Sequence, residues 1–406
     1  MRNLALVYRC ARRLALPRLW AAMSLFAAHT FLWAQTVPQP TEPYAAIDRS
    51  AIDYAGPERS AAHDLPGNEI KIGLILPLTG ARKPEGDALL AAAQMALEDE
   101  APTPLPRALR LELAPRDESG LWGRASSEIV KLVVDDRAIA LVTSPDGRAA
   151  HLAEQVGNRL SVPVVSLASD SQNTQINIPW YFRMVPDDAV QARLFADDIY
   201  HRQRFQKVLL VTQSDHDGRV GKEEFEKAAR RLEVSEPEHV EITAPSGNFA
   251  ALATATSKVK PQAIVLWASA DVTARLLAEL RRYQSDAVIY VCHKALQHEF
   301  ISAAREPGTP KVWIAAAKTN DSRTSLANFE QRFRERTGAV PNPAACEMYD
   351  AVRLIAAGVR AAGPNRARLR DRLAKMGEYQ GISGLISFDG AGNNQAEVAL
   401  IGLPES

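Results

Sequence analysis

The sequence predicts a doubly wound α/β fold. From residue 70 onward, short runs of apolar and β-branched residues alternate with longer helical patterns. Most of these short runs are almost continuously apolar, as strands buried on both faces of a parallel sheet are. With 406 residues and 46% hydrophobic content, the chain can bury one large α/β core or two smaller lobes.

The expected strands and helices alternate along much of the chain. The strands are expected at 70–76, 109–115, 138–144, 162–168, 207–213, 239–244, 263–269, 287–292 and 311–317. The helices are expected at 86–99, 126–135, 149–160, 189–202, 221–232, 270–283, 326–337 and 345–362. The chain ends differently, because the segments GLISFD (384–389) and EVALIGL (397–403) flank the turn DGAGNNQ and predict a β-hairpin.

The composition excludes several classes of partner and cofactor. Lysine plus arginine equals aspartate plus glutamate at 48 each, and no basic-aromatic stripe occurs, so we expect no nucleic-acid partner. No CxxC, HExxH or paired Cys/His spacing is present, so we expect no metal site and no cofactor. Cys292 and Cys346 are expected to be free thiols, with a disulfide between them as the alternative.

The N-terminus has the pattern of an export signal. Residues 1–34 hold five arginines and no acid, and the apolar run LWAAMSLFAAHTFLWA ends at Ala34. Cleavage after Ala34 would change the formal net charge from 0 to −5. A retained membrane anchor is the alternative, because Leu32 stands where a cleavage site usually has a small residue. The proline-rich residues 35–69 are expected to form a flexible arm.

The stretch IKIGLILPLTGARKPEGDALLAAAQMALEDE (70–100) predicts a strand, a loop and a helix, which is the arrangement that cradles phosphate in nucleotide enzymes. It contains neither GxxxxGK[ST] nor GxGxxG, which those sites need. Nucleotide binding is therefore not expected. The helix start still offers unpaired backbone N–H groups to a polar ligand.

The same stretch resembles the opening of the periplasmic leucine/isoleucine/valine-binding proteins, the solute receptors of ABC importers. Further blocks match in order: VVDDRAIALVTSPDGRAAHLAEQVGNRLSVPVVSLAS, PWYFRMVPDDAVQARLFADDIYHRQRFQKVLLVTQSD, YDAVRLIAAGVRAA and ISGLISFDGAGN. The resemblance covers the chain from residue 70 to its C-terminus. It implies two Rossmann-like lobes with parallel sheets, joined by three crossovers, with a ligand cleft between them. The lobes would comprise residues 70–186 with 318–377, and 187–317 with 378–406.

The resemblance also implies which residues of the first lobe contact the ligand. In the amino-acid receptors, the loops after the third and fourth strands bind the ligand carboxylate. The matching stretches here are SPDGRAA, with Gly147 and Arg148, and LASDSQN, with Ser169 and Asp170. Asp170 stands where the family has a threonine and would repel a carboxylate, so an ordinary α-amino acid is disfavoured. Asp170 as a turn cap and Arg148 as a surface charge are the simpler readings.

The second lobe departs from the family in the same way. Asp217 stands at the place of a family tyrosine, and His293 or Lys294 at that of the acid that pairs the ligand ammonium. Trp267 and Ser269 could add an apolar wall and a hydrogen bond, although a tryptophan here is more often part of the core than of a cleft wall. Asp215, His216 and Asp217 are expected to form a turn rather than a metal or acid/base site.

The function expected from this resemblance is an exported, monomeric, periplasmic solute-binding protein. It would capture a small polar molecule (an amino acid, an amide or a related compound) and present it to an inner-membrane ABC permease. A regulatory or sensory module of the same fold, acting through a protein partner, is the alternative. An enzyme is not expected, because the chain lacks a GxSxG elbow, a nucleophile-base pair and a cofactor fingerprint.

Overall fold

The computed structural model describes residues 58–120, 122–175, 178–243, 249–317 and 323–403. The expected export signal, 1–34, and the first part of the expected arm, 35–57, lie outside the described residues. Within the described ranges, no helix is both long enough and apolar enough to span a membrane.

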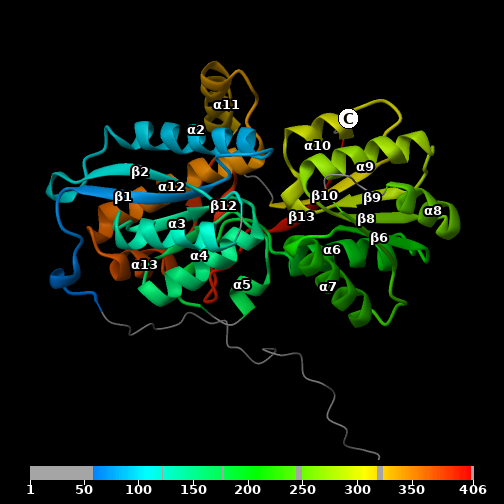
Figure 1. The fold of residues 1–406 in the computed structure, drawn as a ribbon, viewed down its shortest axis with the longest axis horizontal. Helices are drawn as coiled ribbons and strands as arrows, with labels where there is room; N and C mark the ends of the chain where they lie inside the picture. Colours follow the sequence, from blue (N-terminus) through cyan, green and yellow to red (C-terminus); the bar gives the residue numbers. More distant parts are fainter. Residues whose placement is uncertain (1–57, 121, 176–177, 244–248, 318–322, 404–406) are drawn as a thin grey trace, which may run out of the picture. The chain divides into compact units, whose positions relative to one another are not determined.

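The first lobe is built on a five-stranded parallel sheet in the order β2-β1-β3-β4-β5 (Figure 1). Its strands are β1 (Glu69–Leu76), β2 (Arg110–Asp117), β3 (Ala140–Thr143), β4 (Val164–Ser166) and β5 (Tyr181–Arg183). The three inner strands are buried along almost their whole length, as their continuous apolar sequence predicts. β1 pairs with both β2 and β3, so the chain winds outward in both directions from the first strand.

Helices cover both faces of this sheet (Figure 1). They are α2 (Lys83–Glu100), α3 (Trp122–Val134), α4 (Gly147–Leu160), the short α5 (Gln172–Gln175), α11 (Arg323–Thr337), α12 (Pro343–Ala362) and α13 (Arg366–Ala374). α12 packs along α2, so a late segment of the chain completes the first lobe. The start of α4 is fixed by Asp146, whose carboxylate accepts a hydrogen bond of 3.0 Å from the backbone N–H of Ala149.

The second lobe is built on a six-stranded sheet in the order β13-β10-β9-β8-β6-β7. Its strands are β6 (Val208–Gln213), β7 (Glu238–Ile242), β8 (Ala263–Trp267), β9 (Val288–Val291), β10 (Val312–Ala317) and β13 (Val398–Leu403). Its helices are α6 (Asp188–Ala196) with the π-helical turn η3 (Asp197–Arg202), α7 (His216–Arg231), α8 (Phe249–Val259), α9 (Ala270–Arg282), the 3₁₀ turn η4 (His293–Ala295) and α10 (His298–Ala304). The expected two-lobed α/β fold is therefore confirmed.

The chain passes between the lobes three times: from β5 into α6, from β10 to α11 and α12, and from β12 (Leu385–Ile386) to β13. Arg183, at the end of β5, is fully buried beside two of these passages. It donates hydrogen bonds to the side chain of Asn393 and the carbonyl of Asp170, and one of 3.0 Å to Thr174 Oγ1. These contacts tie the first passage to the third.

The expected C-terminal hairpin is wrong. β13 pairs antiparallel with β10 of the second sheet, and β12 pairs instead with the preceding β11 (Tyr379–Gln380). The turn 389–395 folds into a compact loop in which Asp389 Oδ1 accepts hydrogen bonds from the backbone N–H groups of Ala391 and Asn393. A turn-rich segment between two apolar runs therefore carries the chain from one lobe to the other, because β10 offers an open edge to β13.

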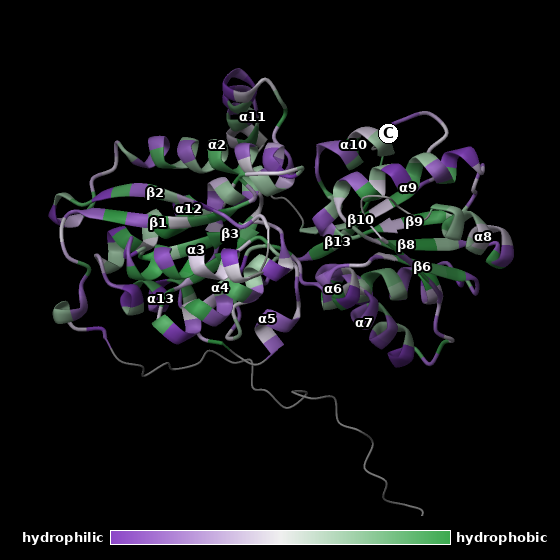
Figure 2. Ribbon diagram, viewed as in Figure 1, coloured by the Kyte–Doolittle hydropathy of each residue, from purple (hydrophilic) through white to green (hydrophobic). Residues whose placement is uncertain are grey.

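Residues 58–68, at the end of the expected arm, are bonded to the first lobe. Arg59 and Asp371 form an ion pair at 2.6 Å, and the side chain of Arg368 donates to Asp64 at 2.7 Å. Hydropathy follows the layers of the fold, with apolar strands inside and polar residues on outward helix faces (Figure 2). In each lobe the core lies between the sheet and its helices, which leaves the strand ends free to carry polar loops.

Candidate functional site

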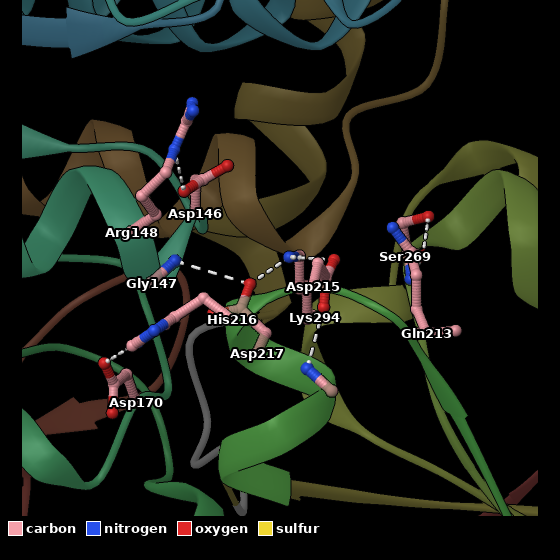
Figure 3. A network of polar contacts seen from close by, with 12 residues as sticks. Asp146, Gly147, Arg148, Asp170, Gln213, Asp215, His216, Asp217, Ser269 and Lys294 are labelled. Atoms are coloured by element: carbon pink, nitrogen blue, oxygen red, sulfur yellow. Dashed lines mark hydrogen bonds and ion pairs between the residues drawn. The ribbon is translucent and has the colours of Figure 1, made fainter. Parts of the chain in front are cut away.

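The residues singled out from the sequence lie at or just after the carboxyl ends of five strands. Those of the first lobe follow β3 and β4, and those of the second lobe lie at β6, β8 and β9. In parallel sheets these ends share one edge, where ligands of open α/β folds bind. Figure 3 shows loops from both lobes meeting there.

Asp217 and Gly147 form the central contact between the lobes (Figure 3). Asp217 Oδ2 accepts a long hydrogen bond of 3.4 Å from the backbone N–H of Gly147, the first residue of α4. A Cβ atom at position 147 would overlap the Asp217 carboxylate, so glycine permits this approach. The carboxylate thus lies at the positive end of the α4 dipole, a favourable place for an anion.

Lys294 completes this contact by pairing with the same carboxylate. Its ammonium also faces Asp215 Oδ2 at 3.8 Å, and Asp146 acts on it electrostatically. Burial lowers the pKa of Lys294, but these three carboxylates outweigh that effect and raise it. Burial, with the neighbouring Asp146 and Asp215, raises the pKa of Asp217 against the attraction of Lys294. Lys294 is therefore the cation that the two acids of the second lobe, Asp215 and Asp217, share.

His216 and Asp170 form a second contact between the lobes, with 2.7 Å between His216 Nε2 and Asp170 Oδ2. The hydrogen bond to Asp170 raises the pKa of His216, although burial opposes it. Asp170 Oδ1 also accepts from the backbone N–H of Gln172 at 2.9 Å, as a turn cap does. Asp170 therefore caps a turn and contacts the other lobe at once, whereas the sequence offered these roles as alternatives.

Two further polar contacts surround this pair. Ser171 donates to Glu224 of α7 at 3.1 Å, again across the two lobes. The carbonyl of Ser169 accepts from the backbone N–H of Asp188 at 2.8 Å. Burial raises the pKa of Asp188 well above its usual range, and among the described residues its Oδ2 atom has no hydrogen-bond partner. The site thus holds a buried carboxyl group whose charged form is disfavoured by burial.

Arg148 belongs to the first lobe alone. Its guanidinium donates to the carbonyls of Gly120 at 3.0 Å and Glu118 at 3.4 Å and faces Asp146 at 3.8 Å. Beside it, Arg82 pairs with Asp146 at 2.6 Å and Glu118 at 3.1 Å. Burial raises the pKa of Glu118 to about 8. Arg82 and Glu118 were not predicted, although Arg82 lies in the quoted PLTGARK loop and could have been considered.

Trp267 does not line a cleft, which corrects that assignment. Its indole is 1% exposed and packs edge-on against Phe195, and a Cβ atom at Gly221 would overlap the ring. The side chain points to the helix layer rather than the strand end. Ser269 does lie at the strand end, but its hydroxyl donates to Gln213 at 2.8 Å and to Asp271 at 2.6 Å, within the second lobe.

His293 and Lys294 are neighbours in sequence but lie in different surroundings. His293 Nε2 lies 2.9 Å from Oε1 of Glu347, in the first turns of α12, and both residues line a cavity of about 320 Å³. Burial lowers the pKa of His293, but Glu347 outweighs that effect and raises it. Glu347 was not predicted, because its place in an apolar helix gives no sequence signal.

The two cysteines of the described chain are free and buried, as expected. Burial raises the pKa of Cys292 to about 12, so its thiol is unreactive at neutral pH. Among the described residues, no group of three or more His, Cys, Asp or Glu side chains is arranged to hold a metal ion.

Comparison with known proteins agrees with this geometry. The periplasmic binding protein family model (Peripla_BP_6) matches residues 69–401. The isoleucine complex of LivJ, a branched-chain amino acid transporter substrate-binding protein of Streptococcus pneumoniae, is 21% identical with a TM-score of 0.69, over 82% of this chain and 95% of that one. No curated protein gave a match.

Two further solved structures share the fold. The leucine-binding protein LivK of Thermotoga maritima is 20% identical with a TM-score of 0.70, over 82% of this chain and 94% of that one. An ABC transporter solute-binding protein of R. palustris, in complex with benzoate, is 17% identical with a TM-score of 0.72, over 82% and 95%. With a family model that spans most of its length and two lobes that meet at their strand ends, the chain belongs to the periplasmic binding protein family.

Proposed function

We propose that this protein is an exported solute-binding protein, which captures a small polar molecule between its lobes and presents it to an inner-membrane ABC permease. One observation carries the proposal: polar loops from the strand ends of both sheets come within hydrogen-bonding distance of each other. A solute in this place would contact both lobes at once. The protein would act as a monomer in the periplasm, exported by residues 1–34.

The mechanism is a shift between two arrangements of the lobes. A solute favours the closed arrangement only if it binds that arrangement more tightly than the open one. The contacts of Asp217 with Gly147 and of His216 with Asp170 already favour the closed arrangement. A bound solute would therefore add to the stability that these contacts give the closed arrangement. Hinge motion in the three interlobe segments would carry the change. No covalent step is involved, and the protein is not an enzyme.

Amino acids, amides and related compounds are the first solutes to consider, since solved neighbours hold isoleucine or benzoate. Asp217 makes it unfavourable for an amino acid to bind here with its carboxylate at the start of α4. Its carboxylate lies on the N–H group at the start of α4, where a ligand carboxylate would otherwise find a donor. A solute carboxylate would have to displace Asp217 or meet its repulsion.

A regulatory module that acts through a protein partner is the second candidate. The same contacts support it, because they hold the two lobes together by side chains of the protein itself. Such a module would need no solute. It would present a permanently closed surface to its partner.

A thermal-shift screen separates the two candidates. The purified protein is melted against amino acids, amides, ureas, amines and small carboxylates, because a solute in excess stabilises the form that binds it. Solute binding predicts a concentration-dependent rise in melting temperature with at least one class. Melting that no class of compound alters contradicts solute capture and favours the module.

A further inference from the structure

The cavity beside His293 lies where the two lobes meet. Its lining comes from the start of α12 and the segment around β12 on one side, and from α10, β10 and β13 on the other. Its volume of about 320 Å³ is near the lower end of small-molecule pockets, which span roughly 300–1,000 Å³. Most of the wall is apolar, including Met184, Leu296, Ile301, Ile314 and Ile386.

Three uncharged polar side chains in this wall are already engaged by the protein. Asn342 caps α12 through the N–H of Ala345 at 2.8 Å, and its amide group donates to Gln297. Ser383 donates to Asp350 at 2.5 Å, and Asn394 donates to the carbonyl of Met184 at 2.7 Å. These groups hold the wall in place and have few hydrogen bonds left for a ligand.

Glu347 differs from them. It is 7% exposed, and its Oε1 atom lies 2.9 Å from Nε2 of His293. Its Oε2 atom is buried and has no hydrogen-bond partner among the described residues. Buried carboxylate oxygens are normally paired, so an unpaired one beside a cavity indicates a missing donor.

We propose that this cavity binds a compact apolar molecule carrying one ammonium group, which donates to the free carboxylate oxygen of Glu347. The inference rests on the proposed function and names the class of its solute. An ammonium group supplies only donors and positive charge, which suits an ionised acceptor. The apolar wall covers the rest of the molecule.

The charges around the cavity agree with this class. The other two charged lining residues, Arg305 and Glu330, are more exposed than Glu347 and have opposite signs. A carboxylate solute would face the carboxylate of Glu347, and His293, the nearest potential cation, is already paired with that group at 2.9 Å. The start of α4, the other place for an anion, is already taken by Asp217.

Isothermal titration calorimetry with three probes of one shape tests the proposal. Benzylamine, benzyl alcohol and benzoate differ mainly in the charge of the polar group. We expect the protein to bind benzylamine most tightly. Glu347→Gln should weaken the binding of benzylamine about tenfold or more, because the amide keeps an oxygen atom for His293 but removes the negative charge. Glu330→Gln removes a charge from the same wall and should change the affinity by less than about twofold.

Three results would overturn the ammonium class. The first is equal or tighter binding of benzyl alcohol or benzoate. The second is benzylamine binding that Glu347→Gln leaves unchanged. The third is no heat of binding from any probe, which would mean that an ordered water donates the missing hydrogen bond to the carboxylate of Glu347. Under any of these, a melting shift with other solutes would leave the proposed function standing, whereas an unresponsive screen would remove both.

Discussion

Asp217 of the second lobe places its carboxylate on the backbone N–H of Gly147, at the first residue of α4 in the first lobe. The protein thus supplies its own anion to a helix start that faces the other lobe. Lys294 pairs with the same carboxylate, so the contact is an ion pair and a helix cap together.

Asp217→Ala should lower the free energy of unfolding by about 2 kcal/mol, because it leaves Lys294 with weaker partners and Gly147 without an acceptor. Asp215, 3.8 Å from Lys294, limits the loss. Denaturant titration measures it. Asp271→Ala is the matched control, since Asp271 is likewise the second residue of its helix, α9, but lies outside this contact. Equal losses in both variants would contradict the role of Asp217.

Gly147→Ala should weaken the interlobe contact, because the new methyl group would overlap the Asp217 carboxylate. In a protein that already carries Asp217→Ala, the same substitution should lower the free energy of unfolding much less. The double-mutant cycle measures this coupling. Gly123→Ala is the control, because Gly123 also lies in the first turn of a helix, with open space around it. Additive effects of the two substitutions would show that residues 147 and 217 do not touch.

The contact between His216 and Asp170 should make stability depend on pH. The pKa of His216 is raised in the folded protein, chiefly by the hydrogen bond to Asp170. Its stabilisation is therefore complete below the unfolded pKa of about 6.5 and is lost as the pH rises through the higher folded value. His216→Gln should remove the fall in melting temperature that this contact causes as the pH rises above about 6.5. His201→Gln, at an exposed pair with Asp197, should leave it in place.

Arg183→Met should destabilise the protein by about 3–5 kcal/mol, since it strips a fully buried guanidinium from the partners that join two interlobe segments. Arg148→Met should cost about 1 kcal/mol or less, because Arg148 is partly exposed and donates mainly to backbone carbonyls. Chemical denaturation of both variants gives the comparison. A similar cost for the two would contradict the linking role of Arg183.

The sequence predicted the lobes well because parallel strands carry their own signal. Runs such as 70–76 and 263–269 are almost continuously apolar, and the structure places a buried strand in each. The C-terminal hairpin failed for a different reason. Strand 398–403 has the same apolar pattern whichever partner it takes, and the open edge of β10 decides the pairing.

The site was predictable only to the level of its loops. The family resemblance pointed to the loops that hold Gly147, Asp170 and Asp217, and the structure brings these loops together at the strand ends. It could not assign Trp267, whose direction depends on packing against Phe195. Nor could it separate His293 from Lys294, which the turn η4 directs to different partners. Glu347 comes from a distant helix and is found only from the folded chain.

A crystal structure of the protein with a solute found by the thermal-shift screen tests the central claim most directly. The account predicts one solute molecule per chain, held between the lobes and contacted by side chains of both. A solute bound to one lobe alone, or on an outer surface with the interlobe contacts unchanged, would contradict it.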